Sequence, residues 1–147
     1  MTEVGRKYLV FTLPGTRYAV DLAEVAEVEE PPALWPIPGA PSCYPGAMNF
    51  HGSIVAVMDL SAFLGRPVAP CLEKVIVLDP AIASLALLVE RVESIVPADQ
   101  VRYDDHQARQ TEEPHSSGSL VLPGGVAAVL LDVVGLVREA TERIAAV

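Results

Sequence analysis

Two apolar, β-rich runs near the start of the chain predict a pair of β-strands. Residues 8–13 (YLVFTL) and 17–22 (RYAVDL) are rich in branched and aromatic side chains, and Pro14, Gly15 and Thr16 separate them. Proline presets one backbone angle of a tight turn and glycine accepts positive φ, so this spacing is typical of a β-hairpin. We therefore expect the chain to open with two antiparallel strands.

A further apolar strand and a short helix are predicted in the middle of the chain. Residues 54–58 are apolar and follow the turn pair His51-Gly52. Asp59 comes next, and an aspartate at this place can cap a helix that reaches Leu64. Similar apolar runs then predict three more strands, over residues 73–78, 85–89 and 92–96.

The chain repeats this order of elements. Residues 52–64 (GSIVAVMDLSAFL) align without a gap with residues 125–137 (GVAAVLLDVVGLV), so that Asp59 matches Asp132. The V-x-x-V of residues 25–28 likewise matches the V-x-x-I that begins at Val92. An ordered match of a glycine, an apolar strand, an aspartate and a short helix argues for an internal duplication.

Each half is expected to form a small barrel of about five strands with a short helix. The approximate limits within a single domain are residues 8–66 for the first barrel, residues 73–137 for the second, and residues 132–144 for a C-terminal helix, and these limits allow strands to interleave between the barrels. A unit of roughly 65 residues leaves much of its surface unburied. The two barrels are therefore expected to share an apolar seam.

Charge and cysteine content exclude several classes of protein. With 19 Asp and Glu against 10 Lys and Arg, the net charge is −9, which repels nucleic acid and anionic lipid surfaces. The N-terminal residues lack an apolar segment followed by a small-residue cleavage site, so we expect a cytoplasmic protein. Cys43 and Cys71 have no metal-type spacing, and we expect neither a metal site nor a disulfide from them.

Residues 31–58 contain no Asp, Glu, Lys or Arg but six prolines. These prolines exclude a membrane-spanning helix, because each removes a backbone hydrogen bond. The passage also holds Trp35, the single tryptophan of the chain, together with Tyr44 and Met48. A lone tryptophan is either a core residue or an interface anchor, and here we expect Trp35 to lie in the core.

Motifs along nearly the whole chain, from Tyr8 to Val137, resemble the CheW-like family, the adaptor domains of bacterial chemosensory arrays. The family signature commonly ends in Gly-x-x-Asn-x-Arg-Gly-x-Ile-x-Pro-Val-x-Asp-Leu. The positions of this chain that fall on the pattern are Gly46, Asn49, Gly52, Ile54, Val57, Asp59 and Leu60. Val89, Glu90 and Val92 resemble a second motif of the family near the start of the second barrel.

The resemblance implies an all-β fold with short helices, in which two five-stranded SH3-like barrels interlock. It implies no catalytic residue, no cofactor and no bound metal. It also implies an adaptor that couples the cytoplasmic tips of methyl-accepting chemoreceptors to the regulatory domain of a CheA-type histidine kinase, in chemotaxis or in a related pathway such as one controlling type IV pili.

Two positions depart from the signature, since His51 stands in place of arginine and Ala56 in place of proline. An arginine holds a carboxylate at two points at any physiological pH, whereas a histidine offers one contact and titrates near neutral pH. We expect His51 to contact Glu27, which resembles the usual neighbour of that arginine, or an acidic receptor side chain. The alternative is a turn histidine that faces water. The partner-binding residues expected from the resemblance are Glu27, Asn49, His51 and Val55.

Two further interpretations remain open. One is a small metal-dependent enzyme whose ligands lie between Asp104 and His115, namely Asp104, Asp105, His106, Glu112, Glu113 and His115. Their spacing lacks a pattern such as His-x-x-x-His, which favours a solvated acidic loop. The other is a diverged adaptor that binds another CheW-like barrel and no kinase. The histidine in place of arginine at position 51 is the reason to consider it.

Overall fold

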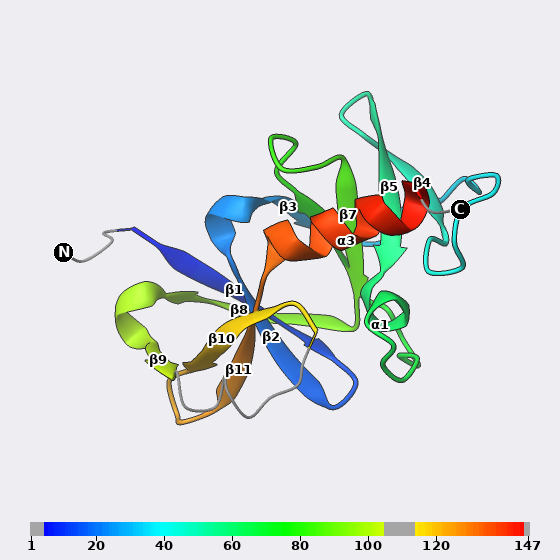
Figure 1. Cartoon of the computed structure of the whole chain (residues 1–147). Helices are drawn as coiled ribbons and strands as arrows, with labels where there is room; N and C mark the ends of the chain where they lie inside the picture. Colours follow the sequence, from blue (N-terminus) through cyan, green and yellow to red (C-terminus); the bar gives the residue numbers. More distant parts are fainter. Residues whose placement is uncertain (1–4, 105–113, 146–147) are drawn as a thin grey trace.

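The structure is a computed structural model that describes residues 5–104 and 114–145. Short β-strands are the main regular structure among these residues (Figure 1). The strands are β1 (Lys7–Leu13), β2 (Thr16–Asp21), β3 (Val25–Glu29), β4 (Gly46–Phe50), β5 (Ser53–Asp59), β6 (Lys74–Leu78), β7 (Leu85–Val89), β8 (Arg91–Pro97), β9 (Arg102–Asp104), β10 (Ser116–Val121) and β11 (Ala127–Leu131). The helices are α1 (Leu60–Phe63) and α3 (Val133–Ala145), with 3-10 turns at Leu22–Glu24 and Ala98–Gln100.

The strands form two sheets, which are the two barrels expected from the sequence. The first barrel has the strand order β8-β1-β2-β11-β10-β9, and the second has the order β3-β6-β7-β5-β4. The first barrel therefore holds a sixth strand, β9, beyond the five expected. β9 is only three residues long and two of them are charged, so it leaves no apolar run in the sequence.

Each half of the chain divides its strands between the two barrels. The first half supplies β1 and β2 to the first barrel and β3, β4 and β5 to the second, whereas the second half supplies β6 and β7 to the second barrel and β8–β11 to the first. β3 follows the β1–β2 hairpin in sequence but pairs with β6, and β8 follows the β6–β7 hairpin but pairs with β1. The strands therefore interleave between the approximate ranges 8–66 and 73–137. Alternation along a strand shows which residues share a face, but it does not show which strand lies beside it.

The internal duplication is visible in the hydrogen bonds at the helix starts. The Asp59 carboxylate accepts a hydrogen bond from the backbone N–H of Ala62 (3.3 Å), and the Asp132 carboxylate accepts one from Gly135 (3.1 Å). Each aspartate thus accepts a hydrogen bond from the backbone N–H three residues later, which is the usual arrangement of a helix N-cap. Moreover, β5 and β11 each pair in parallel with the second strand of a hairpin, β7 and β2 respectively.

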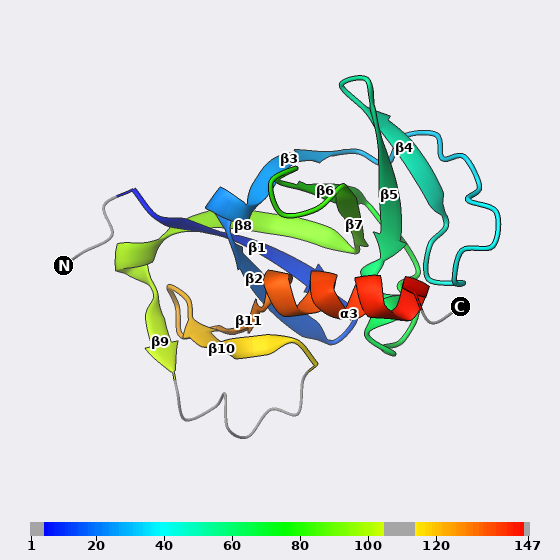
Figure 2. The ribbon, with the colours of Figure 1, turned by 45° about the horizontal axis from the view of Figure 1, so that its top comes forward.

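The apolar seam between the barrels is the largest core cluster. Leu9, Phe11 and Leu13 of β1 point into it, while Tyr8 and Val10 point into a separate cluster inside the first barrel. Helix α3 crosses the molecule from β11 towards β4 and β5 and covers the seam (Figure 2). Its buried residues in the seam are Val133, Leu136 and Ala140. The seam therefore holds the interleaved halves together as one folding unit.

The expectation that Trp35 lies in the core is wrong. Its side chain is 57% exposed, although its backbone forms an isolated bridge with Ala47 of β4. Of the two cysteines, Cys43 is buried and Cys71 is exposed, and both are free thiols. Burial raises the pKa of the Cys43 thiol, which keeps it protonated at neutral pH.

Candidate functional site

The β4–β5 hairpin presents the residues that the sequence singled out. Phe50 and Ser53 pair across it, so His51 and Gly52 form a two-residue turn. Both turn residues have positive φ, 49° for His51 and 86° for Gly52. This is the pattern of a type I′ turn, whose twist matches that of the flanking strands. Asn49 supports the turn, since its side-chain oxygen accepts a hydrogen bond from the Gly52 N–H (2.9 Å).

The turn histidine reaches across to strand β3. The Nε2 atom of His51 lies 2.8 Å from Oε2 of Glu27, as the sequence analysis expected. Both side chains are largely exposed, and the His51 ring also lies against the ring of Phe50, with 4.4 Å between the ring centroids. When the imidazole is protonated, this hydrogen bond becomes an exposed ion pair of modest strength.

The expected role of Val55 in a direct partner contact is wrong. Val55 is only 4% exposed and packs with Met48, its pairing partner, inside the second barrel. Its neighbour Ile54 points the other way and is 77% exposed. Ile54 pairs with Asn49, so the two side chains share the outer face of the hairpin. Ile54 could have been found from strand alternation, because it must face away from the barrel interior if Val55 faces inward.

We call Glu27, Asn49, His51 and Ile54 the hairpin surface. It combines one large exposed apolar side chain with polar groups whose positions are set by internal hydrogen bonds. A surface of this kind suits binding to another protein, because an anchor on a rigid turn loses little conformational entropy on association.

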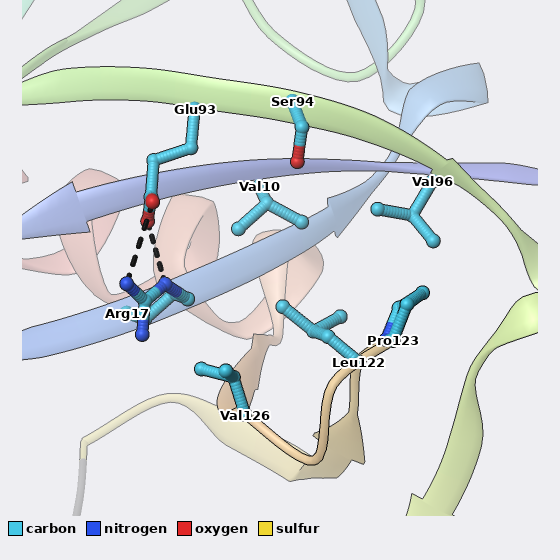
Figure 3. A pocket seen from close by; sticks show the side chains of 8 residues that line it. All are labelled: Val10, Arg17, Glu93, Ser94, Val96, Leu122, Pro123 and Val126. Atoms are coloured by element: carbon cyan, nitrogen blue, oxygen red, sulfur yellow. Dashed lines mark hydrogen bonds and ion pairs between the residues drawn. The ribbon is translucent and has the colours of Figure 1, made fainter.

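A hollow of about 230 Å³ opens in the first barrel. Figure 3 shows the ion pair between Arg17 of β2 and Glu93 of β8 beside the apolar side chains of Val10, Val96 and Leu122. The Arg17 Nε atom lies 2.5 Å from a Glu93 carboxylate oxygen, and this hydrogen bond raises the pKa of Arg17. Since the two charges neutralise each other beside a mostly apolar lining, the hollow suits packing better than acid–base chemistry.

A second histidine–carboxylate contact fastens α3. His115 Nε2 lies 2.7 Å from a carboxylate oxygen of Glu139, and Arg143 contacts the same oxygen at 3.2 Å. The hydrogen bond from His115 lowers the pKa of Glu139. The Arg143 guanidinium also lies over the ring of Phe63 and donates to its carbonyl oxygen (3.3 Å). These contacts connect the turn before β10 with α3 and α1.

The metal-dependent alternative required ligands between Asp104 and His115. Asp105, His106, Glu112 and Glu113 lie outside the described residues. Within the part of the chain that the structure describes, no three His, Cys, Asp or Glu side chains are arranged to hold a metal ion. His115 is engaged by Glu139 on α3.

Comparison with known proteins identifies the family of this chain. A family model described as the CheW-like domain matches residues 7–141. The chain belongs to the CheW-like family. Membership of this family favours an adaptor and scaffolding domain over the metal-dependent enzyme.

Individual relatives of this CheW-like domain agree with the family assignment. Chemotaxis protein CheW of Rhizobium meliloti (strain 1021) is 29% identical over 98 residues, which cover 65% of this chain and 63% of the relative. The crystal structure of scaffolding protein TtCheW from Thermoanaerobacter tengcongensis superposes with a TM-score of 0.70 at 21% identity, covering 86% of this chain and 88% of that chain. The superposition establishes the fold of two interlocked SH3-like barrels.

No helix within residues 5–104 and 114–145 of this CheW-like domain has both the length and the apolar character needed to cross a bilayer.

Proposed function

We propose that this CheW-like domain couples the cytoplasmic tips of methyl-accepting chemoreceptors to the regulatory domain of a CheA-type histidine kinase in chemotaxis. The observation that carries the proposal is the exposed Ile54 on a hairpin whose turn is held by Asn49 and by the contact between His51 and Glu27. Membership of a family of adaptor domains supports it.

The hairpin surface is the proposed docking site for the kinase regulatory domain. Ile54 is 77% exposed, and burying a side chain of this size against a partner contributes about 1.5–3 kcal/mol. Asn49, Glu27 and His51 surround it with groups that can form hydrogen bonds at the rim. An apolar anchor with a polar rim is the usual arrangement of a specific protein interface.

The receptor tip is proposed to bind where the two barrels meet. Val28 of β3 and Val92 of β8 are partly buried against the seam core, and they occupy corresponding strands of the two halves. Ile95 of β8 is 53% exposed. An apolar edge of this kind suits an amphipathic receptor helix, which would bury its own apolar face there.

Calorimetric titration with the isolated regulatory domain of the kinase, and separately with a receptor cytoplasmic tip, tests the proposal. We expect micromolar binding to each, which corresponds to about −8 kcal/mol. Ile54→Ser should weaken kinase binding at least tenfold and leave receptor binding unchanged, whereas Ile95→Ser should do the reverse. Val68→Ser is the matched control for both, because Val68 is 79% exposed but lies outside both surfaces.

Two outcomes would contradict the coupling role. The first is no binding to any CheA-type regulatory domain of the same genome. The second is binding that Ile54→Ser and Val68→Ser affect equally, because the hairpin surface would then be irrelevant. Binding to another CheW-like barrel in place of the kinase would instead support the diverged adaptor.

A further inference from the structure

Trp35 is held at the open edge of β4 by its backbone. Its N–H donates to the carbonyl oxygen of Ala47 (2.9 Å), and its own carbonyl oxygen accepts from the Ala47 N–H (2.8 Å). β4 is the last strand of the second barrel, so Trp35 adds one residue pair to a sheet edge. The backbone of Trp35 is thereby fixed while its indole remains 57% exposed.

The register of the sheet places Trp35 on the same face as Ile54. Trp35 lies opposite Ala47, which lies opposite Ala56 of β5, and the next outward-facing pair along the hairpin is Asn49 with Ile54. Residues directly opposite each other point to the same face, and so do residues two apart on one strand. Trp35 and Ile54 are therefore two large exposed apolar side chains on one face, and the small residues between them are Ala47, which is buried, and Ala56, which is partly buried.

Gly46 shows that this close approach is built into the fold. A Cβ atom at Gly46 would lie 2.6 Å from the carbonyl oxygen of Trp35 and 3.0 Å from Cβ of Leu34. Such contacts are too short for any side chain, and Gly46 is not held in a left-handed conformation that would by itself require glycine. The absence of a side chain at Gly46 is what allows residues 34–35 to lie against β4.

Charge defines the kind of partner that fits this face. Residues 31–58, which supply Trp35, Asn49 and Ile54, contain no Asp, Glu, Lys or Arg. Glu27 is the one carboxylate of the hairpin surface, and its contact with His51 holds it at the hairpin tip. A charged partner group buried between Trp35 and Ile54 would lose its hydration and find no counter-charge among residues 31–58, which is costly. The face therefore selects a partner patch that is apolar and uncharged at its centre.

We infer that Trp35 is a second anchor and a specificity determinant of the hairpin surface, and that it packs against an uncharged apolar patch of the kinase regulatory domain. This inference rests on the proposed function. Exposed tryptophans on rigid backbones are among the residues that contribute most to binding, because they bury a large area at low entropic cost.

The test uses the single tryptophan of the chain as its own probe. The full chain is produced with 5-fluorotryptophan, which gives one fluorine resonance, and is titrated with unlabelled kinase regulatory domain. We expect the resonance to shift on binding and to become protected from a paramagnetic solvent agent. Trp35→Ala should weaken binding at least tenfold, Trp35→Phe less, and the control Val68→Ala should have no effect.

Three results are distinguishable. If calorimetry shows kinase binding but the resonance does not shift and Trp35→Ala binds normally, the inference is wrong and the proposed function stands. If no kinase domain binds, both fail. If Trp35→Ala unfolds at a lower urea concentration than the parent chain, the fluorine measurement on the parent chain still decides the question, because it requires no substitution.

Discussion

His51 in the β4–β5 turn contacts Glu27 of β3 through one hydrogen bond of 2.8 Å between Nε2 and Oε2. β3 and β4 are at opposite ends of the strand order of the second barrel. The contact therefore joins the two ends of that curved sheet and sets where the hairpin tip lies relative to β3. Because a histidine replaces the arginine of the family signature, this connection is a single point of contact rather than two.

Replacing His51 by arginine should strengthen kinase binding. A guanidinium holds a carboxylate at two points, whereas the imidazole holds Glu27 at one, so the hairpin tip is fixed more firmly before the partner binds. We expect His51→Arg to bind the regulatory domain a fewfold more tightly than the parent chain, and calorimetry at a single pH measures the difference. The double variant Glu27→Gln/His51→Arg is the control and should lose this gain, because it removes the carboxylate. Equal affinities for the parent chain and His51→Arg would show that the contact does not influence binding.

Gly46→Ala should destabilise the protein and displace Trp35. The added methyl group meets a backbone carbonyl oxygen at 2.6 Å, and overpacking of this kind costs about 1–3 kcal/mol. Urea unfolding measures the loss, and the fluorine resonance of labelled Trp35 should shift in the free protein. Gly39→Ala is the comparison, because it has open space around the added atom and strains only a left-handed backbone. If the resonance stays in place in Gly46→Ala, the edge contact is not what positions the indole.

Removing either helix cap should cost a similar amount, because the duplication gives the two aspartates the same role. Asp59→Ala and Asp132→Ala each lose a hydrogen bond to an otherwise unpaired helix N–H, which is worth about 1 kcal/mol. Urea unfolding measures both values. Asp132→Asn keeps an acceptor and should retain most of the stability. A loss in Asp132→Asn as large as that in Asp132→Ala would contradict a capping role.

Glu139 should make the docking of α3 sensitive to acid. The hydrogen bond from His115 holds the pKa of Glu139 below its ordinary value of 4.5. The folded state therefore favours the ionised form of Glu139. The stabilisation that this carboxylate gives to the folded state is complete above the ordinary pKa of 4.5, and it is lost as the pH falls through the lowered pKa of the folded state. Glu139→Gln should show a shallower loss of unfolding free energy between pH 5 and pH 3. Glu142→Gln, an exposed position on the same helix, is the control and should follow the parent curve.

Local patterns predicted many of the elements correctly. Pro14-Gly15 between two β-rich runs indicated the first hairpin, and the structure has β1 and β2 there. The alignment of Asp59 with Asp132 indicated two helix caps, and both are formed. These features depend on residues close together in sequence, where backbone preferences and short-range hydrogen bonds dominate.

The candidate site was predictable only in part. The signature pointed to Asn49, His51 and Glu27, and the structure brings His51 and Glu27 together. Val55 was assigned to the surface, although the pairing of Met48 with Val55 turns it inward and leaves Ile54 outside. The order of residues in a strand indicates which ones share a face, but packing against the rest of the fold decides which face is buried.

By itself, the sequence determined the strands, the caps, the duplication and the acidic charge, because these follow from periodicity, turn chemistry and composition. Only the tertiary structure decided how each half divides its strands between the two barrels, and that Trp35 lies on an open sheet edge. Each of these is a contact between segments distant in sequence. Such contacts are selected by the burial of the shared seam between the two halves, and that energy belongs to the assembled fold rather than to any one segment.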